Sequence, residues 1–259
     1  MSYILPNPFP AMDTTTVTTT KTVKHTKKNG SFKPVAAGTK KSHVIFILDD
    51  SYSMLPHAAA TINGFNEYLA GQVADSKRDN IPTKASLYKF NGSNVIAVFK
   101  KQKVKKVEPL SSKTYNPRGG TNLLDAIGTV MEEINDDLSS TRKRDRESVI
   151  ICVLTDGEEN ASRQFNNAKI KGMVEAAEGK NWTFMFLGAN IDAFDVGGAW
   201  GMRTENTIQY GMSNISETIA TASAYTSRAK VARSMGLSSA QTYESANFTD
   251  DERANATKL

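Results

Sequence analysis

Cysteine is almost absent from this sequence, since Cys152 is the only one among 259 residues. A single thiol cannot form an intrachain disulfide, which excludes the disulfide-stapled class of small secreted domains. Cys152 lies inside an apolar run, residues 149–154, so we expect the thiol to be buried. A lone buried thiol is typical of a protein in a reducing compartment.

Long apolar runs are missing as well. None approaches the roughly 18 residues that a membrane-spanning helix needs, so we expect no membrane as a partner. The first dozen residues have neither the basic nor the apolar region of a secretory signal, and we expect no signal peptide. Together these absences predict a cytoplasmic protein.

Sequence motifs for catalysis are also absent. The chain has neither a Gly-x-Ser-x-Gly nucleophile elbow nor a Walker phosphate loop. His25, His43 and His57 show no metal-ligand spacing, and we interpret them as structural or exposed. We therefore predict that the protein is not an enzyme.

Positive charge is confined to one end of the chain, although the net charge is +5. Residues 1–41 contain seven Lys and one Asp and carry +6, so the remaining residues carry −1. This segment has prolines at its start and a Thr-rich tract over residues 14–20. Such a composition predicts a solvated arm in isolation. Its β-branched residues also suit a strand added to the sheet of an assembly neighbour, so we predict an extended, docking arm.

A second basic stretch, residues 100–106, contains five lysines. It resembles a phosphate-binding track, but its nearest aromatic residue is Phe99 and no stacking platform for bases is evident. We interpret it as an exposed strand end and loop, and we do not expect nucleic acid as a partner.

From residue 42 onward, apolar runs alternate with amphipathic segments. Asn91-Gly92 between two β-rich runs predicts a hairpin. Strands alternating with helices predict an α/β fold, with a doubly wound, mostly parallel sheet that helices cover on both faces. This domain is expected to span residues 42–236, and the polar residues 237–259 are expected to form a second extension. The predicted strands are 43–48, 84–90, 94–99, 149–154, 182–187 and 207–210, and the predicted helices are 55–75, 122–138, 165–178, 193–200 and 215–234.

Three short segments far apart in the sequence carry oxygen-bearing side chains at the ends of these elements. In an open α/β sheet, ligands gather at the carboxyl ends of the strands, so the segments are expected to converge. Each segment alone is better explained as a helix cap or a turn, but their joint order and strand context favour a common site. Two carboxylates and three hydroxyls, without His or Cys, suit a hard divalent cation: Mg²⁺, Mn²⁺ or Ca²⁺. The segments are Asp49-Asp50-Ser51-Tyr52-Ser53, Gly119-Gly120-Thr121 and Thr155-Asp156-Gly157, and the predicted ligands are Asp49, Ser51, Ser53, Thr121 and Asp156.

The D-x-S-x-S, Thr and Asp arrangement resembles the metal-ion-dependent adhesion site (MIDAS) of von Willebrand factor type A (VWA) domains. The likeness extends over roughly residues 42–236. Over this range the chain resembles a stand-alone subfamily of intracellular bacterial and bacteriophage VWA proteins. Four further stretches carry it: TINGFNEYL at 61–69, PRGGTNLLDAIG at 117–128, TDGEENASR at 155–163 and FLGANIDAF at 186–194.

The resemblance implies a Rossmann-like VWA fold and a role for each ligand. Ser51, Ser53 and Thr121 would coordinate the metal directly, and the two aspartates directly or through water. One coordination position would stay open and the cation would be under-compensated, so a carboxylate from a protein partner can complete the site. Mg²⁺, which keeps waters and prefers octahedral oxygen, suits this use best. The function implied is a metal-dependent, adhesion-type binding module.

One departure from the family lies at Tyr52, where Gly is usual. Gly permits backbone conformations that Tyr disfavours, so Tyr52 either narrows the site, contacts the partner or alters metal affinity. Around the ligands we predict a partner-binding rim. Acidic neighbours, Glu159 among them, either raise cation affinity or are simply solvated. The rim residues are Asp50, Tyr52, Asn122 and Glu158.

Three other functions remain open. Because the subfamily occurs in bacteriophages, the protein is alternatively a virion structural or accessory protein whose arm docks on neighbouring subunits. The location would then be the host cytoplasm or the virion. Nucleic-acid binding through the basic arm is weaker, and so is metal-dependent hydrolysis by Asp49 and Asp156, because no nucleophile or leaving-group acid accompanies them.

Overall fold

The computed structural model describes residues 40–92, 94–142, 145–180 and 182–258. Apart from Lys40 and Lys41, the predicted arm lies outside the described residues, so its docking role stays a prediction. In the part of the chain that is described, no helix is both long and apolar enough to cross a membrane.

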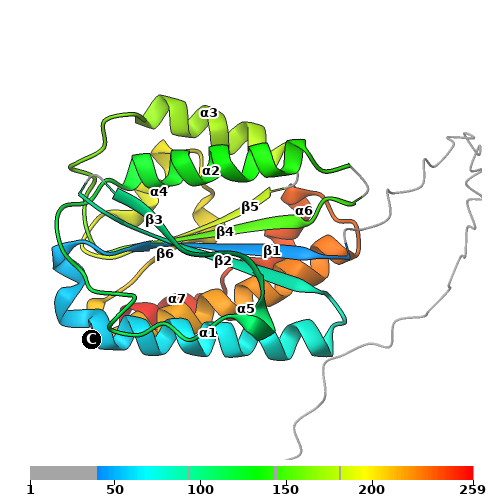
Figure 1. Ribbon diagram of the computed structural model, residues 1–259, viewed down its shortest axis with the longest axis horizontal. Coiled ribbons are helices and arrows are strands. Elements are labelled where there is room, and N and C mark those ends of the chain that lie inside the picture. Colours follow the sequence, from blue (N-terminus) through cyan, green and yellow to red (C-terminus); the bar gives the residue numbers. More distant parts are fainter. Residues whose placement is uncertain (1–39, 93, 143–144, 181, 259) are drawn as a thin grey trace, which may run out of the picture. The chain divides into compact units, whose positions relative to one another are not determined.

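A six-stranded sheet forms the centre of the domain (Figure 1), in the order β3-β2-β1-β4-β5-β6. All neighbouring strands are parallel except β2 and β3, which are antiparallel. The doubly wound, mostly parallel sheet expected from the sequence is thus confirmed. Its strands are β1 (Ser42–Asp49), β2 (Thr83–Asn91), β3 (Asn94–Lys103), β4 (Ser148–Thr155), β5 (Trp182–Gly188) and β6 (Thr207–Gln209).

The central strands are apolar because helices cover both of their faces. Along β1, Phe46 and Leu48 point into one hydrophobic cluster, while Ile45 and Ile47 point into the other. In register, Phe46 stands beside Leu87 of β2 and Cys152 of β4. Successive side chains of a strand face opposite sides, so one apolar run supplies two cores.

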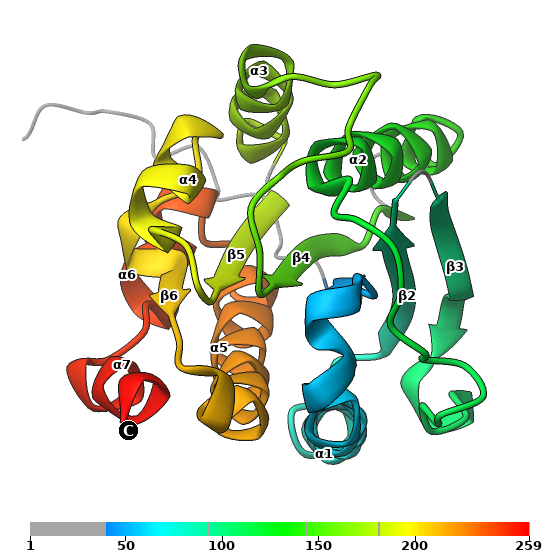
Figure 2. The same cartoon turned by 90° about the vertical axis from the view of Figure 1, so that its left-hand side faces the viewer.

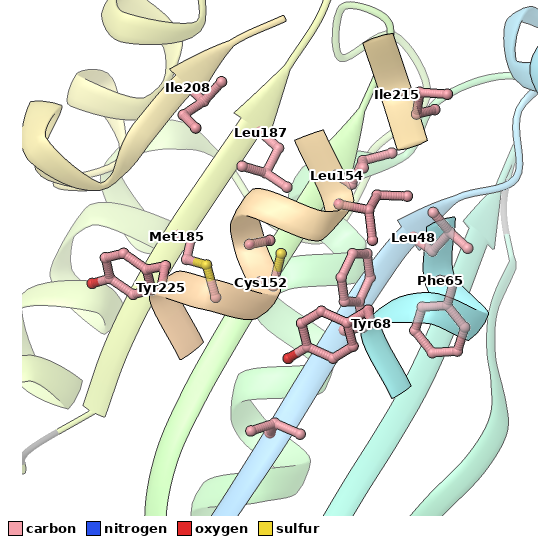
Figure 3. Packing of buried hydrophobic residues seen from close by; sticks show 14 of the residues in the cluster. Leu48, Phe65, Tyr68, Cys152, Leu154, Met185, Leu187, Ile208, Ile215 and Tyr225 are labelled. Atoms are coloured by element: carbon pink, nitrogen blue, oxygen red, sulfur yellow. The ribbon is translucent and has the colours of Figure 1, made fainter. Parts of the chain in front are cut away.

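Two layers of helices enclose the sheet (Figures 1 and 2). On one face lie α1 (Ala58–Arg78) and α5 (Ile215–Ser234), and on the other lie α2 (Leu123–Ser139), α3 (Asn167–Glu178) and α4 (Ala193–Ala199). Figure 3 shows the core on the first face, where Phe65 and Tyr68 of α1 meet residues such as Cys152. The thiol is fully buried, as expected, and burial raises its pKa well above the usual value.

The hairpin predicted at Asn91-Gly92 joins β2 to β3, with Asn91 paired to Asn94. Gly92 has a φ of +55°, a conformation in which a side chain is strained. The strand β3 runs four residues beyond its predicted end, to Lys103, because its pairing with β2 continues past a register irregularity near Leu87. Four of the seven residues in the basic stretch are therefore strand, and the other three form a single 3₁₀ turn, η2 (Val104–Lys106).

The expected C-terminal extension is corrected by the structure. Residues 237–258 form two helices, α6 (Ser239–Ala246) and α7 (Asp250–Thr257), which contact α5. Phe248 between them is buried, and its ring lies 4.8 Å from that of Tyr225 on α5. Polar composition concealed a few apolar side chains that complete the core on this face. This segment therefore belongs to the folded domain.

Candidate metal site

The first and third predicted segments meet at the carboxyl ends of β1 and β4, the edge that faces the viewer in Figure 2. Ser53 Oγ donates a hydrogen bond to Asp156 Oδ1 at 2.6 Å, and the hydroxyls of Ser51 and Ser53 lie 3.1 Å apart. Thr121 joins them, because a Cβ built on Gly157 would be 3.8 Å from both Ser53 Oγ and Thr121 Oγ1. The convergence expected from the sequence is thus present.

Asp49 is oriented by its neighbours. Its Oδ1 accepts a hydrogen bond from the Ser51 backbone N–H at 2.8 Å, and its Oδ2 accepts one from Thr155 Oγ1 at 2.6 Å. Thr155 ends β4, so the two adjacent parallel strands are joined directly at their carboxyl ends. The backbone carbonyl of Asp49 accepts a hydrogen bond from the buried Tyr115 hydroxyl at 2.7 Å. These bonds restrict the first metal segment to one conformation.

Thr121 is held by its backbone and not by its side chain. Its N–H donates to Asn160 Oδ1 at 2.9 Å, and its carbonyl accepts from the N–H groups of Asn160 and Ala161. On the other side, the Tyr52 N–H donates to the carbonyl of Gly119 at 3.0 Å. The second segment is therefore fixed between the first and the third, and the Thr121 hydroxyl is left for a ligand role.

Burial sets the electrostatics of the two carboxylates. It raises the pKa of Asp49 to about 6, and it also raises the pKa of Asp156, despite hydrogen bonds that favour the charged forms. A raised carboxyl pKa means that the negative charge is poorly solvated in the folded protein. A divalent cation between these groups would relieve that cost.

The residues present suit such a cation. Asp156 Oδ2 is buried and has no hydrogen-bond partner among the described residues, although buried polar atoms are normally satisfied. Four of the five predicted ligands are buried, and Ser53 is exposed, so the group opens to solvent at Ser53. No cluster of three or more His, Cys, Asp or Glu side chains offers another metal site within the described ranges.

The predicted rim needs correction at two positions. Asp50 is buried, and its Oδ2 lies 2.9 Å from Lys89 Nζ and accepts a hydrogen bond from the Asn91 side chain. Asn122 is also buried, at the start of α2. Neither can meet a partner at the surface. Tyr52 and Glu158 are exposed, as a rim requires.

Tyr52 occupies the position where Gly is usual without backbone strain. It begins the 3₁₀ helix η1 (Tyr52–His57) that precedes α1, and it is not among the described residues with positive φ. Its side chain is 68% exposed. Tyr52 therefore projects into solvent and does not fill the site.

Two carboxylates that support the site were not recognised as such in the sequence. Asp125 accepts hydrogen bonds from three consecutive backbone N–H groups, those of residues 163–165. Glu159 accepts from the N–H groups of Leu124, Ala161 and Ser162 and from the Ser162 hydroxyl. Both bind the loop after β4 to the first turn of α2. Glu159 is thus a structural carboxylate and not a solvated one.

The remaining predicted polar residues have structural roles or lie elsewhere. His43 is buried, hydrogen-bonded to Ser86 Oγ at 2.8 Å, and burial lowers its pKa to about 3. It is a structural histidine, as predicted. His57 is half-buried in η1, and His25 lies outside the described residues.

Solved structures with the same fold include two proteins from distant sources. The pilus adhesin SpaC from Lactobacillus rhamnosus GG matches with a TM-score of 0.53 and 13% identity, over 73% of this chain and 31% of that one. Proximal thread matrix protein 1 from the mussel byssus matches with a TM-score of 0.50 and 15% identity, over 71% of this chain and 47% of that one. This chain thus spans 47% of the mussel protein's length and 31% of the adhesin's length. At such identities the likeness shows the fold alone.

A third structure, the manganese-loaded TRAP protein from Plasmodium vivax, has a TM-score of 0.47 and 17% identity, over 71% of this chain and 72% of that one. No curated protein matches the sequence. The family model of the von Willebrand factor type A domain matches residues 43–209, which cover the sheet from β1 to β6 and all five predicted ligands. The chain belongs to the von Willebrand factor type A domain family.

Proposed function

We propose that this domain binds a protein partner through a divalent cation held by Asp49, Ser51, Ser53, Thr121 and Asp156. The observation that carries the proposal is the convergence of these five residues around a buried, unpartnered Asp156 Oδ2 beside an exposed Ser53. A partner carboxylate is the proposed final ligand, because two aspartates and three neutral hydroxyls leave one coordination position of the cation open and its positive charge under-compensated.

The surface around the site supports a partner with apolar residues beside its acidic one. Tyr52 and Leu55 are large side chains that are 68% and 43% exposed, and Pro56 beside them is exposed too. Exposed aromatic side chains such as Tyr52 are typical anchors of protein interfaces. The exposed Glu158 is the one rim residue that would repel an acidic partner unless the cation is present.

Mg²⁺ is the proposed ion, since hydroxyls, carboxylates and retained waters form the oxygen environment that it prefers. The mussel protein is also described with a zinc-occupied MIDAS motif and the Plasmodium protein with manganese. Those two overlays have TM-scores of 0.49 and 0.47 and do not select a metal for this chain. Calorimetric titration with Mg²⁺, Mn²⁺, Ca²⁺ and Zn²⁺ would decide between them.

The partner is tested by capture from a lysate with Mg²⁺ or with EDTA. The wild type, Asp49→Ala and a deletion of residues 1–41 are compared, with Asp136→Ala as the matched control. Asp136 is an exposed carboxylate on α2, outside the ligand set and the rim. We expect capture to disappear with EDTA and with Asp49→Ala, and to survive Asp136→Ala.

Capture that is unchanged by EDTA but lost on deletion of residues 1–41 would contradict the proposal. It would favour an assembly protein built on a VWA fold. The virion alternative, in which the arm docks on neighbouring subunits, is tested by measuring oligomer formation with and without residues 1–41. A binding role in place of catalysis, and a cytoplasmic location, are part of the same proposal. Turnover of phosphate or peptide esters that requires Mg²⁺ or Mn²⁺ and Asp156 would refute the first of these.

A further inference from the structure

A concave surface lies at the opposite end of the sheet from the predicted metal ligands. It is a pocket of about 710 Å³, within the range typical of ligand sites. The C-terminal part of α1, the first residues of β2, and the end of β3 with η2 form its walls. In Figure 1, β1 and β2 begin at this end, on the right.

Lysines from four segments of the chain gather around this pocket. With Glu147 as the one carboxylate in the lining, the lining carries a net charge of +4. Glu147 itself is neutralised, because it lies 2.8 Å from Lys84 Nζ and 4.0 Å from Lys101 Nζ. Among the described residues, no carboxylate forms an ion pair with the other four lysines. The five lysines are Lys41, Lys77, Lys84, Lys103 and Lys105.

Between the lysines the surface is apolar. Val73 is 37% exposed there, and Pro82 and the buried Val104 complete the floor. The lining contains neither an aromatic ring, on which a base would stack, nor an arginine, which would grip a phosphate with two hydrogen bonds. These absences in the described lining disfavour nucleic acid. Lysines around aliphatic side chains suit carboxylates that flank an aliphatic residue.

We propose that this lysine pocket binds an acidic peptide segment of a partner protein, with an aliphatic side chain on Val73 and Val104 and carboxylates on the surrounding lysines. The chain's own arm is not that segment, because residues 1–41 carry +6. The pocket and the predicted metal ligands lie at opposite ends of the sheet, so this binding needs no metal and does not depend on the proposed adhesion function.

The test is fluorescence anisotropy of the full chain with a labelled octapeptide of alternating Glu and Leu, in EDTA at low salt. Lys103→Glu/Lys105→Glu reverses two exposed charges of the pocket. Lys106→Glu/Lys113→Glu is the matched control, because it changes the net charge equally at two exposed lysines outside the lining. Val73→Asp tests the apolar floor at a side chain exposed enough to tolerate the change. Peptides with Gln for Glu, or Ser for Leu, are the ligand controls.

We expect the first double variant and Val73→Asp each to weaken binding of the Glu–Leu peptide about tenfold, and the control pair to change it less than about twofold. Either substituted peptide should bind at least about tenfold more weakly. Equal losses in the two double variants would show diffuse attraction by the net charge of the chain and overturn the proposal. So would a requirement for Mg²⁺, or tighter binding of oligothymidine with the same dependence on Lys103 and Lys105.

Discussion

The two ends of the central sheet carry opposite charge in different physical forms. At the carboxyl ends of the strands, carboxylates such as Asp49 and Asp125 are buried and held by backbone N–H groups. At the amino ends, lysines such as Lys103 and Lys105 are exposed and reach into solvent. Buried charge with fixed geometry suits one small ion, whereas mobile charge on flexible stems suits an extended anionic chain.

The comparison also separates charge that supports the fold from charge that is left for a ligand. Asp125 and Glu159 have both carboxylate oxygens engaged by N–H or hydroxyl groups, and Asp50 is paired with Lys89 through one oxygen, yet all three lie at the same end as Asp49 and Asp156. In the described part of this end, Asp50 and Asp156 each have one buried carboxylate oxygen without a partner, and Asp156 is the one whose other oxygen accepts a hydrogen bond from the exposed Ser53. An acidic sequence neighbourhood alone does not identify the metal ligands.

The largest effect is expected where a carboxylate supports the fold. Asp125→Ala removes the charged acceptor of three backbone N–H groups and should lower the free energy of unfolding by about 4 kcal/mol. Urea unfolding measures it. Asp136→Ala, on the exposed face of the same helix, is the control and should cost less than about 0.5 kcal/mol. Equal losses in both variants would contradict the assignment.

The pH dependence of stability should be the next largest effect. Because burial raises the pKa of Asp49 to about 6, the folded protein holds a proton that the unfolded chain releases near pH 4. Stability from this group is therefore fully present below about pH 4 and lost as the pH rises to about 6. The difference amounts to about 3 kcal/mol in EDTA.

Urea unfolding of the wild type and Asp49→Asn across this pH range, in EDTA, isolates the contribution of Asp49. The variant should not lose stability as the pH rises, and saturating Mg²⁺ should reduce the loss of stability in the wild type. Parallel curves for the two proteins would show that Asp49 is not buried in an uncompensated form.

Loss of a metal ligand should have an effect of similar size on binding. Asp156→Asn keeps the shape of the side chain but removes one of two negative charges, so Mg²⁺ affinity should fall at least about 100-fold. Calorimetric titration measures the affinity, and Glu158→Gln should change it less than about threefold. A comparable loss in the second variant would place the ion nearer the rim than we propose.

The smallest effect is expected among the exposed charges outside the pocket. Lys100 pairs with Glu133 at 2.9 Å, and both side chains are well exposed. Lys100→Met should lower the free energy of unfolding by no more than about 0.5 kcal/mol, because solvent screens such pairs. A loss above about 1 kcal/mol would show that surface lysines of this region support the fold and would weaken the contrast between the two ends.

Much of the fold followed from hydrophobic periodicity. The apolar runs at 43–48 and 149–154 became β1 and β4 with boundaries shifted by a residue, because a strand buried on both faces needs continuous apolar sequence. The five predicted ligands followed from motif order, and their contacts confirm that they converge. That they hold a metal stays a prediction.

The helices α6 and α7 were missed although the sequence carried a signal for each. Ser238 with Gln241, and Thr249 with Glu252, form capping boxes, in which each side chain accepts the backbone N–H of the other residue. Low apolar content outweighed this signal in our interpretation. Short helices of this kind depend on a few contacts, such as Phe248 against Tyr225, that no local pattern contains.

The sequence by itself determined the order of strands and helices as far as α5, the family and the segments that supply the candidate ligands, because these depend on local periodicity and on residue types at fixed spacing. Only the tertiary structure decided that Asp50 turns to Lys89, that Asp125 and Glu159 bind backbone, and that four segments bring five lysines around one pocket. Each of these depends on the distance between residues far apart in the chain, which packing sets and sequence spacing does not.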